Sequence, residues 1–225
     1  MDLVDELREQ VRWTQSHGEE VANSLSHGLG LLAAALGTPV LLNEAWEGGS
    51  PAFIIGTCIF AATMVFLYLG SAVYHLWPRT RIKGLLQIVD HSAIFFLIAG
   101  TYTPLTLGPL HGPWGWTILA LVWLLAAFGV ILKASKGVAH RPRLAISLYL
   151  GMGWLILVAI RPLALAVPLS TLLWLLAGGV VYTGGVIFFI NDHKRYRHFV
   201  WHLFVLGGTL CHYLAVLTYA TSANG

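Results

Sequence analysis

The chain has 225 residues, of which 57% are hydrophobic and only 10% are charged, with a formal net charge of +3. Soluble domains carry about 25% charged residues, so the composition excludes an ordinary soluble protein and indicates an integral membrane protein. The first twenty residues are dense in charge and lack the apolar core of a secretory signal peptide. Their Leu3, Leu7 and Val11 recur every four residues, which fits a short helix on the membrane surface as well as a frayed polar tail.

Apolar runs fill most of the remaining sequence. A helix needs about 20 apolar residues to cross a bilayer. Seven runs meet this length, at roughly 21–42, 52–77, 84–107, 114–134, 142–161, 168–190 and 198–220. We therefore predict an all-α fold, a seven-helix transmembrane domain over residues 21–221 that follows a cytoplasmic segment, 1–20. No room is left for a soluble catalytic domain, so any chemistry takes place inside the bundle.

The Lys and Arg residues gather on alternate connections. Twelve of the 13 lie in the N-terminal segment or in the second-to-third, fourth-to-fifth and sixth-to-seventh connections, and only Arg161 lies on the other side. Because basic residues mark cytoplasmic loops, we predict a cytoplasmic N-terminus and a C-terminus outside. The positive net charge then reflects membrane topology, and we expect no nucleic-acid partner.

Ionisable residues inside the spans converge at one depth. His198 and His202 are four residues apart at the start of the seventh span, so both lie on one helix face. His75 ends the second span, one turn after Ser71, and Asp90 lies about two turns into the third. With the predicted topology, three imidazoles and a carboxylate lie in the cytoplasmic half of the membrane. Ionisable groups are costly there and usually functional.

This set of side chains fits zinc. A catalytic zinc takes three protein ligands and keeps one position for water, whose pKa it lowers towards 7. His75, His198 and His202 would bind the metal, and Asp90 would hold the water or take its proton. Ser71 would stabilise the developing oxyanion or hold the water. The alternative is that Asp90 pairs with a histidine as a purely structural polar contact.

Motifs of other hydrolases do not occur. The residues between His198 and His202 are Phe, Val and Trp, so the His-Glu-x-x-His motif of zinc proteases is missing. Gly-x-Ser-x-Gly, the nucleophile elbow of serine hydrolases, is also missing from the sequence. A standard intramembrane protease is therefore excluded.

The combined motifs resemble the bacterial hemolysin III group of the progestin and adipoQ receptor family. They are Glu-Val-Ala-Asn-Ser-Leu-Ser-His-Gly at 20–28, Ser71-x-x-x-His75, Asp90 with Ile-Ala-Gly-Thr-Tyr-Thr-Pro at 98–104, and His198-x-x-x-His202 with His212. The resemblance covers nearly the whole chain and extends to a superfamily that includes adiponectin receptors and alkaline ceramidases. It implies zinc bound by the three histidines, with Asp90 contacting the metal through water and Ser71 beside the ligands.

The resemblance also implies a function. Better-understood members of the superfamily are zinc-dependent hydrolases of lipid amides, and bacterial members have been linked to membrane lipid homeostasis. We therefore expect a multi-pass protein of the bacterial inner membrane that hydrolyses a lipid amide or ester, with membrane lipids or a fatty-acyl molecule as substrate or ligand. The alternative is a non-enzymatic sensor, receptor-like or cytolytic protein that zinc stabilises.

Three other histidines differ in their expected roles. Asn23 and His27 are four residues apart near the start of the first span, and they would either face the site or anchor the helix at the interface. His212 lies ten residues after His202, about 15 Å along the helix, too far to bind the same metal. His91 points about 100° away from Asp90, and we exclude it as a ligand.

Overall fold

The computed structural model describes residues 15–135 and 142–223, and all regular secondary structure within them is helical. The elements are α2 (His17–Gly48), α3 (Pro51–Leu76), α4 (Arg81–Leu107), α5 (Pro113–Ala134), α6 (Pro142–Gly153), the 3₁₀ helix η1 (Leu155–Ala159), α7 (Ile160–Ala166), α8 (Leu169–Ile190) and α9 (Arg197–Ala223). Seven segments are long and apolar enough to cross a membrane. The predicted all-α, seven-span fold is confirmed, whereas the segment around residues 3–11, for which a surface helix and a polar tail were both open, lies outside the described residues.

The first two helices begin at well-formed caps. Ser16 and Glu19 form a capping box at the start of α2, in which each side chain bonds the other residue's backbone N–H. Ser50 caps α3, with Pro51 in the first turn. The α2 helix runs from His17 to Gly48, longer at both ends than the apolar run 21–42. At its start, the capping box extends it into the charged N-terminal segment.

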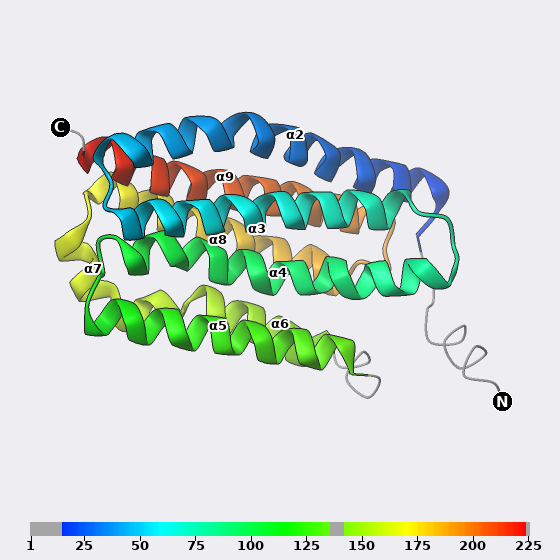
Figure 1. Ribbon diagram of the computed structural model, residues 1–225. Coiled ribbons are helices and arrows are strands. Elements are labelled where there is room, and N and C mark those ends of the chain that lie inside the picture. The colour runs from blue at the N-terminus through cyan, green and yellow to red at the C-terminus, as the bar shows by residue number, and fades with distance from the viewer. Residues whose placement is uncertain (1–14, 136–141, 224–225) are drawn as a thin grey trace.

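The helices run lengthwise and alternate in direction (Figure 1). The α3 helix packs between α2 and α4, and α9 packs between α2 and α8. The start of α2, the α3–α4 connection and the α8–α9 connection therefore meet at one end. We call this the basic end, because Arg79, Arg81, Lys194, Arg195 and Arg197 lie there.

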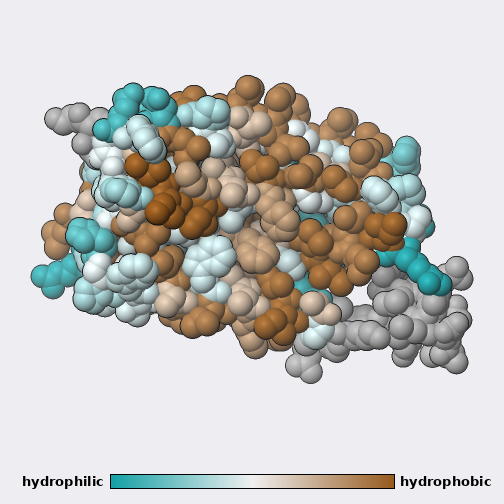
Figure 2. Space-filling model, in the orientation of Figure 1, coloured by the Kyte–Doolittle hydropathy of each residue, from teal (hydrophilic) through white to brown (hydrophobic). Residues whose placement is uncertain are grey.

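Hydrophobic side chains cover the outside of the bundle. In Figure 2 they extend along the helices, and hydrophilic residues gather at the two ends. Leu29, Leu36, Leu165 and Leu169 are each at least 67% exposed. In a soluble protein such a surface would be an association site, whereas in a bilayer it faces the lipid chains.

The fifth span is interrupted, although the sequence predicts one continuous run at 142–161. It consists of α6, η1 and α7 and extends to Ala166. The break follows Gly151 and Gly153, which are poor helix formers. The Tyr102 hydroxyl of α4 donates to the carbonyls of Met152 (2.7 Å) and Gly153 (3.0 Å) and accepts from the Ile156 N–H (3.0 Å). Such contacts satisfy backbone groups that the membrane itself cannot.

Glycines permit close packing of α8 on α9. A Cβ atom at Gly185 would lie 2.6 Å from Phe204 Cβ, and one at Gly208 would lie 2.6 Å from the Tyr182 ring. These distances are too short for any side chain, which is the reason that small residues line helix contacts in membranes. The packing fixes the rotation of α9 and hence the direction of the histidines in its first turns.

Candidate metal centre

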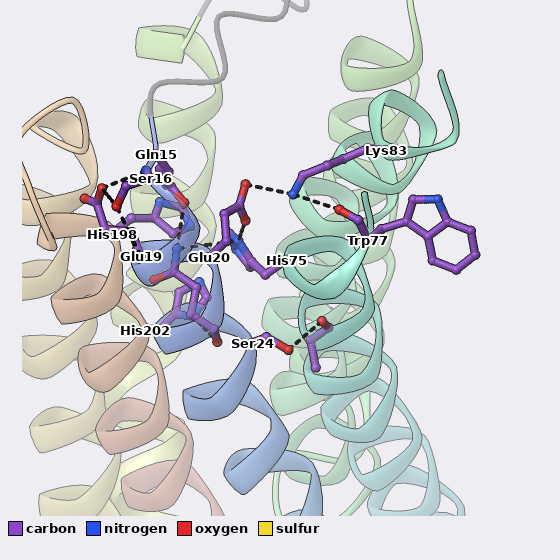
Figure 3. A network of polar contacts seen from close by, with 12 residues as sticks. Gln15, Ser16, Glu19, Glu20, Ser24, His75, Trp77, Lys83, His198 and His202 are labelled. Carbon is purple, nitrogen blue, oxygen red and sulfur yellow. Dashed lines mark hydrogen bonds and ion pairs between the residues drawn. The ribbon is translucent and has the colours of Figure 1, made fainter. Parts of the chain in front are cut away.

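Three buried histidines from two helices meet near the basic end. His75 lies in the last turn of α3, and His198 and His202 lie in the first turns of α9. One ring nitrogen of each lies within 4.8 Å of the others, and their exposed fractions are 3%, 7% and 1%. Their ring centroids are 4.7–5.1 Å apart. The three residues that the sequence predicts as ligands are therefore brought together in one cluster (Figure 3).

Hydrogen bonds fix how His75 and His202 present their rings. His75 Nδ1 donates to Glu20 Oε2 at 2.8 Å, and His75 Nε2 is buried without a partner among the described residues. His202 Nδ1 lies 3.2 Å from the Asn23 carbonyl and 3.0 Å from Ser26 Oγ, which itself donates to that carbonyl. With Nδ1 as the donor in both rings, Nε2 carries the lone pair that a metal requires.

Glu20 also binds a buried lysine. Its Oε1 accepts from Lys83 Nζ at 2.7 Å, and Lys83 donates to the Trp77 carbonyl as well. Lys83 is only 1% exposed, so its ammonium needs this carboxylate as a counter-charge. Figure 3 shows Glu20 between His75 and Lys83, joining α2, α3 and the start of α4. Sequence reasoning gave Glu20 and Lys83 no role at this site: Glu20 only opens the motif at 20–28, and Lys83 was used only for the membrane topology.

His198 is held less firmly. Its Nδ1 lies 3.9 Å from Asp192 Oδ2, beyond hydrogen-bond distance, and both ring nitrogens are buried without a hydrogen bond to any described residue. Burial raises the pKa of the Asp192 carboxyl, and the neighbouring His193 opposes that shift. His198 is thus the member of the cluster whose ring orientation depends least on neighbouring protein groups.

Asp90 faces the cluster across a small cavity. The cavity has a volume of about 10 Å³ and is lined by Asp90, His198, His202, His27 and His91, among others. That is about the space that one water needs. Ser71 is fully buried, and its Oγ lies close to Asp90 without a hydrogen bond of good geometry. The arrangement therefore has room for a single water or ligand atom between the carboxylate and the imidazoles.

The remaining polar residues fall into two groups. Asn23 and His27 lie against the cluster rather than at the interface: the Asn23 carbonyl accepts from His202, and the His27 ring stacks on the His202 ring at 3.6 Å. His91 is not one of the three clustered histidines, as expected, but it lines the same cavity. His212 lies apart from them, packed against Gly178 of α8.

A larger, apolar cavity adjoins the small one. Its volume is about 80 Å³, and the walls of both cavities include Leu67, Ile94, Trp201 and Val205. It extends between α3, α4, α6, α8 and α9 to the break in the fifth span and to His212. A pocket of about one water, lined by a carboxylate and histidines, thus shares part of its wall with a larger apolar cavity inside the bundle.

The fold and this cluster define a class of protein: a seven-helix membrane protein with a buried three-histidine centre. The chain belongs to the Haemolysin-III related family, which it matches over residues 15–213. It is 40% identical to Hemolysin-3 of Bacillus cereus over 208 residues, 92% of this chain and 94% of that protein.

Two further relatives extend the likeness. The chain is 40% identical to the Hemolysin-3 homolog of Bacillus subtilis (strain 168), over 89% of this chain and 94% of that protein. It is 28% identical to the human monocyte to macrophage differentiation factor, over 89% of this chain and 84% of that protein. No solved structure matches the chain.

Proposed function

We propose that the protein is a zinc-dependent hydrolase of lipid amides or esters in the bacterial inner membrane, linked to membrane lipid homeostasis, with its site near the cytoplasmic face. The observation that carries the proposal is the adjacency of two cavities: the small one, lined by Asp90 and histidines, shares wall residues with an apolar one of about 80 Å³. A site that binds a reactive carbonyl at the head of an apolar chain needs this combination of polar and apolar space.

The residues fit zinc. Zinc prefers imidazole ligands, and a catalytic site has three protein ligands and one open position. His75, His198 and His202 would hold the metal, since His75 Nε2 and both nitrogens of His198 are buried without a hydrogen bond to the described residues. When bound, zinc polarises the substrate carbonyl and makes water a stronger nucleophile at neutral pH.

The chain's own residues supply positioning and proton transfer. Asp90 accepts a proton from the attacking water and returns it to the leaving amine or alcohol. Ser71, close to Asp90, orients that water or donates its hydroxyl hydrogen to the carbonyl oxygen as negative charge develops there. The apolar cavity holds an acyl chain, whose burial contributes about 0.8 kcal/mol per CH₂. That binding energy keeps the carbonyl beside Asp90.

The second candidate is a non-enzymatic membrane protein, a sensor or a cytolysin, in which zinc only joins α3 to α9. Two observations favour it. The relatives in Bacillus carry the name Hemolysin-3, and each histidine of the cluster is at most 7% exposed, as in a closed structural site.

Asp90→Asn separates the two candidates. Four detergent-purified proteins would be compared: the wild type, Asp90→Asn, Ser71→Ala and the control His212→Ala. For each protein we would measure zinc content, thermal stability and the hydrolysis of ceramides and phospholipids. The hydrolase proposal predicts a folded Asp90→Asn protein that retains most of its zinc but loses hydrolysis, a smaller loss for Ser71→Ala, and an active control. If function instead follows zinc content and stability in every variant, the metal is structural and the hydrolase proposal is wrong.

A further inference from the structure

His27 is a buried histidine beside the three-histidine cluster. It lies on α2, is 3% exposed, and neither ring nitrogen has a hydrogen-bond partner among the described residues. A buried polar group without a hydrogen bond costs about 1–3 kcal/mol, and such groups in native proteins call for an explanation. Packing alone is better served by an apolar ring of the same size, so the two nitrogens point to a ligand.

Two neighbouring rings fix the plane of the His27 imidazole. The His202 ring lies parallel to it, with centroids 3.6 Å apart and an interplanar angle of 7°. The Tyr68 ring contacts it edge-on at 5.3 Å and 75°. Because the N–H bond and the lone pair of an imidazole lie in the ring plane, this stacking leaves both outside the stack. The edge of the His27 ring, with both nitrogens, is therefore not covered by the stack on His202, and both residues line the small cavity.

Among the described residues that line this cavity, His27 and His198 are the histidines whose two ring nitrogens have no hydrogen-bond partner. Asp90, when ionised, only accepts hydrogen bonds. The Nδ1–H group of His202 is already bonded to the Asn23 carbonyl, and His198 is one of the three clustered histidines. A neutral imidazole carries one N–H whichever tautomer it adopts, so His27 provides a donor that is not yet used. It is not one of the three clustered histidines, so donation to a ligand does not compete with metal binding.

We propose that His27 is a substrate-binding residue that donates a hydrogen bond to the carbonyl oxygen of a lipid amide or ester. This inference rests on the proposed function, because it requires that a carbonyl group enters the small cavity. His91 is the other histidine beside Asp90 in that cavity. Its Nδ1 lies 3.2 Å from Lys133 Nζ, so one of its ring nitrogens has a partner, unlike those of His27, and it serves as the matched control.

The test uses a ligand that carries a carbonyl and an acyl chain. Dodecanohydroxamic acid would be titrated into the full-length, zinc-loaded protein in detergent, with zinc content measured on the same samples. His27→Phe keeps a ring for the stack on His202 but removes both nitrogens, and His27→Gln restores a donor. We expect about tenfold weaker binding by His27→Phe, equal to the loss of one hydrogen bond of about 1.4 kcal/mol. Zinc content should be unchanged, and His27→Gln should bind more tightly than His27→Phe.

The outcomes separate this inference from the proposed function. Wild-type affinity in both His27 variants would overturn the role of His27 and leave the proposed function standing. Loss of zinc from both variants would show that His27 supports the metal instead, and would also overturn the inference. Weaker binding by His91→Phe, with His27→Phe unaffected, would assign the donor to His91. A wild-type protein that binds the hydroxamate equally well with and without zinc would refute the proposed function, and the inference with it.

Discussion

Substitution of Glu20 by Gln separates metal binding from the stability of the fold. Glu20 accepts from His75 Nδ1 at 2.8 Å and from Lys83 Nζ at 2.7 Å. Glutamine has nearly the same shape but no charge, so it weakens both contacts without changing the packing. Charge-assisted hydrogen bonds are roughly twice as strong as neutral ones. The substitution therefore acts on a proposed metal ligand and on a buried lysine at the same time.

The structure predicts a different magnitude for each effect. Lys83 is 1% exposed, and leaving a buried charge without its partner costs about 3–5 kcal/mol. For the metal, loss of a carboxylate that holds a histidine ligand typically weakens binding 10–100-fold. We expect Glu20→Gln to lower the free energy of unfolding by about 3 kcal/mol and to weaken zinc binding by at least about tenfold.

The double variant Glu20→Gln with Lys83→Met distinguishes these effects. It replaces the buried ion pair by two neutral side chains, which is often nearly neutral for stability. Its unfolding free energy should therefore return towards the wild-type value, whereas its zinc affinity should stay as weak as in Glu20→Gln. Unfolding would be followed in mixed detergent micelles without zinc, and zinc affinity by competition with a chromophoric chelator.

Two results would refute this reasoning. Wild-type zinc affinity in Glu20→Gln would mean that Glu20 does not position His75. Recovery of zinc affinity together with stability in the double variant would mean that Glu20 acts only through the fold.

Three further predictions follow from other parts of the molecule. The wild-type protein should bind about one zinc, measured by elemental analysis. Alanine at any one of the three clustered histidines should remove most of this zinc, whereas His212→Ala should keep it. Full zinc occupancy in the cluster variants would exclude this site. A reporter fused after Gly225 should report a location outside the cell, and a reporter inserted within 136–140 should report a cytoplasmic location. A cytoplasmic C-terminus would contradict the charge-based topology. Tyr102→Phe should lower the free energy of unfolding by about 1–3 kcal/mol, because it leaves backbone groups at the break in the fifth span without a hydrogen bond. The zinc content of this variant should be unchanged. A variant as stable as the wild type would show that the hydroxyl is not needed there.

Properties that depend on local periodicity were available from the sequence. Hydropathy over about 20 residues locates seven spans because the bilayer sets that length. The four-residue spacing places His198 and His202 on one face because the helix has 3.6 residues per turn. The depth of His75 follows from its place at the end of a span, next to a basic connection. These features needed no knowledge of how the helices pack.

Contacts between helices were decided only by the tertiary structure. His75 and Glu20 are 55 residues apart, and their pairing depends on the rotation of α3 against α2. The His27–His202 stack and the break in the fifth span depend on packing in the same way. Hydropathy does not predict these rotations. Lipid chains are as apolar as the helix surfaces, so the hydrophobic effect does not favour one face of a helix for contact with other helices. Small residues and interhelical hydrogen bonds set the rotations instead, as Gly185 and Tyr102 do here.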